Sequence, residues 1–213
     1  MRFVVLCSSR GTTFQATLER IADGSLSARC IGLITDKDDR GCVEKAGQAK
    51  VPVEIVGHAK DESREGYDRR VDEAIEKLVT SDELRMTRGK NAKFETRDSK
   101  FLVVCMGWMF ILSPWFIERW RNRILNVHPS LLPRHPGAHA HEDVLKAGDT
   151  ISGMTIHVID EGLDTGRILL QKECPVLPGD TIESLQFRVQ ELEKEWYPKV
   201  LGMIMNGEMK LAS

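Results

Sequence analysis

One stretch near the start decides the fold class: Phe3-Val4-Val5-Leu6-Cys7-Ser8-Ser9-Arg10-Gly11-Thr12-Thr13. Its unbroken apolar run, 3–7, is typical of a strand that is buried on both faces of a parallel sheet. Residues 12–22 then carry Phe14, Leu18 and Ile21 at helical spacing, which predicts a helix directly after the turn. A buried strand that leads through a short glycine turn into a helix is the repeating unit of an α/β fold.

The same alternation continues along the chain. Further strands are predicted over 30–34, 53–56, 101–106 and 124–127, and further helices over 42–50, 64–79 and from Pro114, with Ser113 as its N-cap. The pattern then changes to two successive strands, one around 154–158 and one over 168–176, before a closing helix over 181–205. We therefore expect an open, mostly parallel twisted sheet flanked by helices, Rossmann-like in its N-terminal half, with an antiparallel addition in the C-terminal half.

The composition limits the class of protein. A chain of 213 residues is long enough for one well-buried domain and marginal for two, so we expect a single domain over 1–213. The formal net charge of −2 leaves no dominant basic surface for nucleic acid. No uninterrupted apolar run is long enough for a membrane span, and the five cysteines include no C-x-x-C pair. These features predict a cytoplasmic protein with reduced thiols.

Residues 80–100 interrupt the regular plan. Ten of these residues are charged, and the segment stands where a short link from helix to strand would be enough. The charge density favours a solvated surface insertion, and a partner-binding loop is the alternative.

The turn over 8–13 is the first candidate site. Backbone N–H groups at the start of a helix, together with Gly11 and the hydroxyls of Thr12 and Thr13, are suited to a phosphate. A simple helix cap by either threonine explains the same residues equally well. The turn has neither the G-x-G-x-x-G of dinucleotide sites nor the G-K-[ST] of a Walker loop.

A second candidate lies at the end of the strand over 124–127. Asn126 and His128 are two residues apart, so they share a face where the strand ends, and ligands bind at carboxyl ends of such strands. An amide donor beside an imidazole can stabilise an oxyanion and move a proton. The prolines at 129, 133 and 136 then stiffen the loop.

The turn Asp160-Glu161-Gly162-Leu163-Asp164-Thr165-Gly166 is a third candidate. Its two glycines allow a tight turn that presents Asp164 to a neighbouring strand, where the carboxylate would hold His128 in one tautomer and favour its charged form. An acidic surface turn is the alternative, and the spacing does not match a calcium loop.

Two other chemistries are weaker. A zinc site is suggested by four clustered histidines, at 128, 135, 139 and 141, but Pro136-Gly137 prevents a helical pair, and no cysteine lies near. A serine nucleophile is not supported because G-x-S-x-G is absent and Ser130 has no evident third partner.

These motifs together closely resemble the folate-dependent formyltransferases. The likeness to that superfamily is carried by Asn126-Val127-His128-Pro129-Ser130-Leu131-Leu132-Pro133, Pro136-Gly137, and 162–166 with the upstream His157. A closer likeness, to the glycinamide ribonucleotide formyltransferases, is carried by 9–13, 63–68, 109–114, Arg188-Val189-Gln190, Glu193 and Tyr197-Pro198. It covers nearly the whole chain except 80–100.

The resemblance implies a reaction and a set of roles. The formyl group of 10-formyltetrahydrofolate, the co-substrate, passes to the amine of glycinamide ribonucleotide, without a metal, with Asn126, His128 and Asp164 as catalytic residues. The substrate's phosphate and ribonucleotide would be bound by Gly11, Thr12, Thr13, Gln190 and Glu193, with Glu193 near the amine. The folate would be bound by Arg64 at its glutamate tail, by the backbone of Met109, Phe110, Ile111 and Leu112 at its pterin, and by Asn126, Asp160 and Glu161.

Three departures from the family pattern keep other functions open. The first turn has Thr12-Thr13 where the family usually has Ser-Asn, Phe110 stands where Arg is common, and 80–100 is unexpected. The alternatives are transfer to another amine, such as that of an amino-sugar nucleotide, a formyltetrahydrofolate hydrolase, and a non-catalytic folate or nucleotide module. We expect small-molecule substrates as the only ligands, no nucleic acid or membrane, and a monomer or homodimer.

Overall fold

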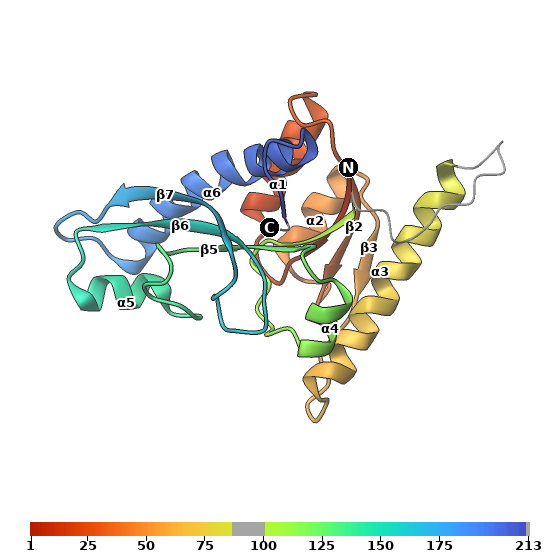
Figure 1. Cartoon of the computed structure of the whole chain (residues 1–213), viewed down its shortest axis with the longest axis horizontal. Coiled ribbons are helices and arrows are strands. Elements are labelled where there is room, and N and C mark those ends of the chain that lie inside the picture. The colour runs from red at the N-terminus through yellow and green to blue at the C-terminus, as the bar shows by residue number, and fades with distance from the viewer. Residues whose placement is uncertain (87–100, 212–213) are drawn as a thin grey trace.

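The computed structural model describes residues 1–86 and 101–211. Its strands form one sheet in the order β3-β2-β1-β4-β5-β6-β7 (Figure 1). The first five strands in the chain pair in parallel, whereas β6 is antiparallel to both β5 and β7, so the predicted fold class is confirmed. The strands are β1 (Arg2–Leu6), β2 (Arg29–Thr35), β3 (Val53–Ile55), β4 (Phe101–Cys105), β5 (Ile124–His128), β6 (Ile151–Val158) and β7 (Ile168–Pro175).

Helices cover both faces of this sheet and create two hydrophobic cores. Because side chains alternate along a strand, Phe3 and Val5 of β1 face one core while Val4 and Leu6 face the other. The first core also takes side chains from α1, α2, α5 and α6, and the second takes them from α3 and α4. The helices are α1 (Thr12–Ala22), α2 (Gly41–Gln48), α3 (Arg64–Met86), α4 (Pro114–Arg119), α5 (Ala140–Ala147) and α6 (Ile182–Met205).

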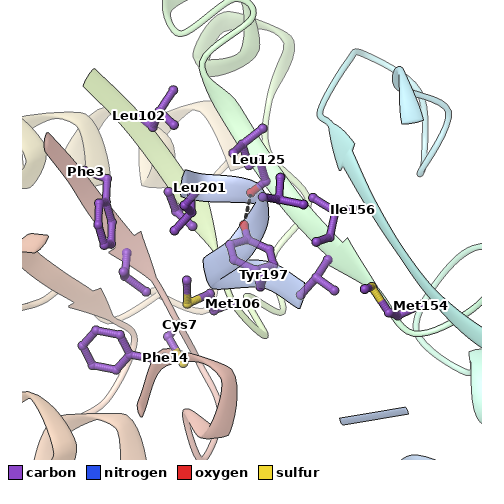
Figure 2. Packing of buried hydrophobic residues seen from close by; sticks show 14 of the residues in the cluster. Phe3, Cys7, Phe14, Leu102, Met106, Leu125, Met154, Ile156, Tyr197 and Leu201 are labelled. Atoms are coloured by element: carbon purple, nitrogen blue, oxygen red, sulfur yellow. Dashed lines mark hydrogen bonds between the residues drawn. The ribbon is translucent and has the colours of Figure 1, made fainter. Parts of the chain in front are cut away.

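The closing helix α6 is tied to the sheet by a buried tyrosine. Tyr197, 1% exposed, donates its hydroxyl to the carbonyl oxygens of Cys105 and Leu125, at 3.2 and 3.3 Å. Figure 2 shows this ring among the apolar side chains of the first core, with its hydroxyl directed at Leu125. The helix that carries Gln190 and Glu193 is therefore held against the centre of the sheet.

The prediction for 80–100 was wrong in its first third. Residues 80–86 are the last turns of α3, and Asp82 is buried there at 4% exposure rather than solvated. Its carboxylate lies 2.6 Å from the guanidinium of Arg29 and 3.7 Å from that of Arg2, and an acid paired in this way can be buried. The prediction from charge density therefore ended the helix too early. The remaining residues of this segment, 87–100, lie outside the described residues.

Local predictions had mixed success elsewhere. Ser113 caps α4 as expected, because its hydroxyl accepts from the N–H of Phe116. Helix α5, within the stretch after Pro136, was not predicted. Capping of α1 by a threonine was wrong: Gly11 is the N-cap, in the left-handed region at φ 72°, and no side chain caps the helix. A Cβ at Gly11 would lie 2.7 Å from that of Cys42. Both the left-handed backbone and this close approach therefore favour glycine at position 11.

The order of strands places a crevice at one edge of the sheet. After β1 the chain moves to β2 and β3 on one side, and from β4 onward it moves to the other side. In such sheets, ligands bind at the carboxyl ends of the strands at the point where the strand order reverses, here between β1 and β4. Both proposed sites, the turn after β1 and the end of β5, lie at this edge. None of the helices in the described residues is long and apolar enough to span a bilayer.

Candidate active site

Two neighbouring strands bring three polar side chains together. Asn126 on β5 pairs in register with His157 on β6, so their side chains share the face of the sheet opposite the first core. The Asn126 Nδ2 lies 3.2 Å from the His157 Nε2. His128 follows on the same face of β5 and is 4% exposed. This cluster was expected for Asn126 and His128, whereas His157 entered the sequence argument only as part of a motif.

Both nitrogens of the His128 ring face oxygen atoms. Its Nε2 donates to the carbonyl oxygen of His135 at 2.8 Å, and its Nδ1 lies 3.3 Å from Oδ2 of Asp164. A carbonyl can only accept, so Nε2 carries a hydrogen, and the adjacent carboxylate favours a second proton on Nδ1. The Asp164 carboxylate therefore faces Nδ1, and the orientation of the His128 ring is fixed from both sides.

The Asp164 carboxylate is held in place by the loop that contains Gly137, and Asp160 shapes the turn that carries it. Asp164 adopts a left-handed backbone at φ 54°, and its Oδ2 accepts from the N–H of Gly137 at 2.8 Å. Upstream in the same turn, Asp160 accepts from Gly162 N–H at 3.1 Å and from the hydroxyl of Thr165 at 2.7 Å. Asp160 is exposed, and these two hydrogen bonds to its carboxylate shape the turn that carries Asp164.

Burial controls the charge of the other imidazoles near His128. Burial lowers the pKa of His157, although Asp164, 3.7 Å from its Nε2, opposes the shift. The neutral ring can then accept from Asn126 at Nε2 and donate from Nδ1 to the carbonyl of Val158 at 3.3 Å. Burial, together with repulsion from His128, lowers the pKa of His141 to about 4. Burial therefore favours the neutral form of both of these rings.

A separate pocket of about 400 Å³ lies over the turn after β1. The structure brings Gln190 of α6 to the same pocket as Gly11 and Thr12, as the sequence predicted. The pocket also contains Ser9 and Arg10 of the same predicted turn, and four residues that the sequence argument did not assign: Asp39, Arg40, Gly41 and Gln186. Residues 39–41 lie where the loop after β2 enters α2. The rule that ligands bind at the carboxyl ends of parallel strands would have identified them had it been applied to β2.

Thr13 and Glu193, which were also predicted to bind the acceptor, do not line this pocket but contact each other. The Thr13 hydroxyl donates to the Glu193 Oε2 at 2.9 Å, across the interface of α1 with α6. Burial raises the pKa of Glu193 to about 7, an effect that this hydrogen bond partly opposes. Glu193 can therefore exchange a proton near neutral pH.

Two of the features predicted to bind the folate, Arg64 and the segment 109–112, lie at the start of α3. Arg64 begins that helix and is exposed. One turn later, the ring of Tyr67 lies 5.0 Å from that of Phe110, and Asp68 accepts the N–H of Ser113 at 2.5 Å. The segment 109–112 is anchored by buried Leu112 and exposes Met109 and Ile111, while Glu161 is exposed on the loop after β6.

The clustered histidines do not converge as metal ligands would. The His135 Nε2 lies 2.7 Å from Asp149 and its carbonyl accepts from His128, whereas His139 is exposed at the start of α5. Within 1–86 and 101–211, no group of three His, Cys, Asp or Glu side chains could hold a metal ion. The Ser130 hydroxyl donates to the carbonyls of Arg134 and His135, which is a structural use.

Comparison with known proteins identifies the family. A family model described as formyl transferase matches residues 1–201. The chain belongs to the formyl transferase family. This formyltransferase is 31% identical to the phosphoribosylglycinamide formyltransferase of Escherichia coli (strain K12), over 99% of the chain and 90% of that relative. It superposes on the solved glycinamide ribonucleotide transformylase 1 of Symbiobacterium toebii with a TM-score of 0.83 and 32% identity, covering 97% of this chain and 88% of that one.

Longer relatives contain the same unit. The formyltransferase is 34% identical to the trifunctional purine biosynthetic protein adenosine-3 of Bos taurus over 99% of its own length. It spans only 14% to 19% of the length of the trifunctional relatives that it matches in cattle and in two Drosophila species. The resemblance stated from the sequence motifs is confirmed at the level of the family.

Proposed function

We propose that this formyltransferase transfers the formyl group of 10-formyltetrahydrofolate to the amine of glycinamide ribonucleotide. The products are formylglycinamide ribonucleotide and tetrahydrofolate, a step of de novo purine biosynthesis. The observation that carries the proposal is the position of Asn126, His128 and Asp164, gathered at the same edge of the sheet as a pocket lined by a helix N-terminus. The names of the relatives in Escherichia coli and Symbiobacterium toebii support the choice of acceptor.

The three residues divide the chemistry among them. As the amine attacks the formyl carbon, negative charge develops on the formyl oxygen. The Asn126 amide stabilises it by a hydrogen bond, and a protonated His128, whose two nitrogens already face His135 and Asp164, stabilises it by its charge. Asp164 favours that imidazolium through its position 3.3 Å from Nδ1. A new C–N bond forms while the bond between the formyl carbon and the folate nitrogen breaks. The proton lost by the amine passes to that nitrogen through a water molecule, or through His128 once its Nε2 leaves the carbonyl of His135.

The remaining residues bind and prepare the substrates. The turn at Gly11 and the backbone N–H groups from Thr12 onward would hold the phosphate, because the start of α1 leaves these N–H groups without helical partners, whereas the N–H of Gly11 donates to the Ser9 hydroxyl at 3.3 Å. Glu193, whose pKa is raised to about 7 by burial, takes a proton from the ammonium and leaves the nucleophilic amine. The folate is proposed to lie along 109–112, with its glutamate tail toward Arg64 and the Asp160–Glu161 turn over its pterin.

The location and size of the protein are also part of the proposal. All five cysteines are free thiols, which fits a reducing compartment, and we place the enzyme in the cytoplasm. We treat 1–213 as one formyltransferase domain that acts on small molecules and needs no metal.

The decisive experiment is product analysis with the purified protein. Incubation with 10-formyltetrahydrofolate should give tetrahydrofolate only when glycinamide ribonucleotide is added, with formylglycinamide ribonucleotide formed in equal amount. Release of formate without an acceptor would instead favour a hydrolase. Turnover with an amino-sugar nucleotide but not with glycinamide ribonucleotide would assign a different acceptor.

A further inference from the structure

The pocket over the first turn has a second wall, formed by the start of α2. Arg40 is the N-cap residue of α2 and lines this pocket. Its Nε and Nη2 donate to the two carboxylate oxygens of Asp36, at 3.0 and 2.6 Å. The Asp36 side chain is only 5% exposed and follows β2 directly, so it holds the guanidinium in one orientation at the carboxyl edge of the sheet.

Arg40 keeps donors available for a ligand. Asp36 uses one side of the guanidinium, and within 1–86 and 101–211 the Nη1 of Arg40 has no hydrogen-bond partner. The Arg40 guanidinium holds the pKa of Asp36 below its usual value although burial acts in the opposite direction, so the pair stays ionised. An arginine oriented in advance loses little side-chain entropy when an anion binds to its free donors.

The first turn alone offers fewer donors than its sequence indicates. The single hydroxyl proton of Thr13 is already donated to Glu193, so this side chain has no proton left for a phosphate. The N–H of Gly11 donates to the Ser9 hydroxyl at 3.3 Å, so what remains at the turn are the other backbone N–H groups and the hydroxyls of Ser9 and Thr12. A phosphate dianion in this pocket therefore needs a further donor.

We propose that Arg40 is a substrate-binding residue, which holds the phosphate of a ribose phosphate acceptor through its Nη1 donors. This assignment rests on the proposed function for the identity of the acceptor. Arg10, which also lines the pocket and makes no ion pair with any described residue, adds positive charge from the facing turn. Asp39 lines the pocket as well; its carboxylate is suited to a ribose hydroxyl, so a sugar phosphate fits the pocket better than inorganic phosphate does.

The test compares two arginines that are each paired with a buried aspartate side chain. Arg40→Met removes the proposed donor, and Arg188→Met is the matched control, because Arg188 makes a similar two-point contact with Asp180 but does not line the pocket. Calorimetry with ribose 5-phosphate should show affinity reduced about 10- to 100-fold in Arg40→Met and retained in Arg188→Met. The KM for glycinamide ribonucleotide should rise by a similar factor, while the KM for 10-formyltetrahydrofolate changes less than about twofold.

The double variant Asp36→Asn/Arg40→Met guards against a folding defect, since it leaves no unpaired buried carboxylate. It should unfold close to the wild-type temperature and still show the weak binding. Wild-type affinity for ribose 5-phosphate in either Arg40 variant would overturn the assignment, as would an equal loss in Arg188→Met or no binding by the wild type at millimolar concentration. If binding depends on Arg40 but glycinamide ribonucleotide is not formylated, the proposed acceptor fails while the role of Arg40 stands.

Discussion

The Nδ1 atom of His128 lies 3.3 Å from Oδ2 of Asp164, although His128 ends β5 and Asp164 follows β6, with helix α5 in the connection between these two strands. The contact exists because β6 returns antiparallel along β5 and the turn after β6 comes back to the end of β5. This relationship makes the charge on the imidazole depend on a residue that the β5 strand does not contain.

Replacing Asp164 by Asn should reduce kcat on the order of 10²–10³-fold, because the neutral amide no longer favours the imidazolium that stabilises the developing oxyanion. The KM for the acceptor should change little, since Asp164 does not line the phosphate pocket. Steady-state kinetics measure both effects. Asp149→Asn is the control: Asp149 contacts another imidazole, that of His135, at 2.7 Å. Normal turnover in Asp164→Asn would refute the assigned role.

The pH dependence of activity should report Glu193. Burial raises the pKa of this carboxyl to about 7, so its carboxylate predominates only above that pH, and kcat/KM for the acceptor should rise through about pH 7. Glu193→Gln should lose this limb and keep the hydrogen bond from Thr13. A limb that persists unchanged in the variant would belong to another group.

The same group should affect stability in the opposite direction. Because the pKa of Glu193 in the fold lies above its ordinary value of 4.5, ionising this carboxyl costs more free energy in the folded protein than in the unfolded chain. The protein is therefore more stable when Glu193 is protonated. That contribution is fully present below about pH 4.5 and is lost as the pH rises through about 7. Urea unfolding across this range should therefore show the wild type losing free energy of unfolding relative to Glu193→Gln.

Tyr197→Phe should lower the free energy of unfolding by about 1 kcal/mol, since the buried hydroxyl that joins α6 to the carbonyls of Cys105 and Leu125 is removed. The ring still fills its place in the first core (Figure 2). Urea denaturation monitored by circular dichroism gives the change, and kcat measured in parallel should stay close to wild type. A large loss of kcat at unchanged stability would contradict a purely structural role.

Gly166→Ala should destabilise the turn that carries Asp164. A Cβ at position 166 would lie 1.7 Å from the carbonyl oxygen of Val158, so the backbone must move, at a cost of about 1–3 kcal/mol, and kcat should fall with it. Gly47→Ala in α2 is the matched control: its Cβ meets no atom within 4 Å, and alanine favours a helix by about 1 kcal/mol. Thermal unfolding should separate the two variants in sign; equal effects would refute the steric argument.

Much of the fold could be predicted because short-range patterns decide it. Continuous apolar runs such as that of β1 have to be buried on both faces, and the amphipathic helices between them have to cover those faces. The prediction failed where a charged side chain forms ion pairs with residues far away in the sequence. Asp82 was expected in solvent, yet Arg29 from β2 and Arg2 from β1 allow it to be buried at the end of α3.

The sequence by itself determined the strand–turn–helix units and the position of Gly11. It also placed Asn126 and His128 on one face of a strand, because a period of two residues follows from strand geometry alone. Only the tertiary structure decided which groups complete those positions. Asp164 reaches His128 through the antiparallel return of β6, Glu193 reaches Thr13 because α6 packs on α1, and Arg40 joins the pocket because β2 lies beside β1. These contacts depend on how separate segments pack, and no local periodicity encodes a distance between residues far apart in the chain.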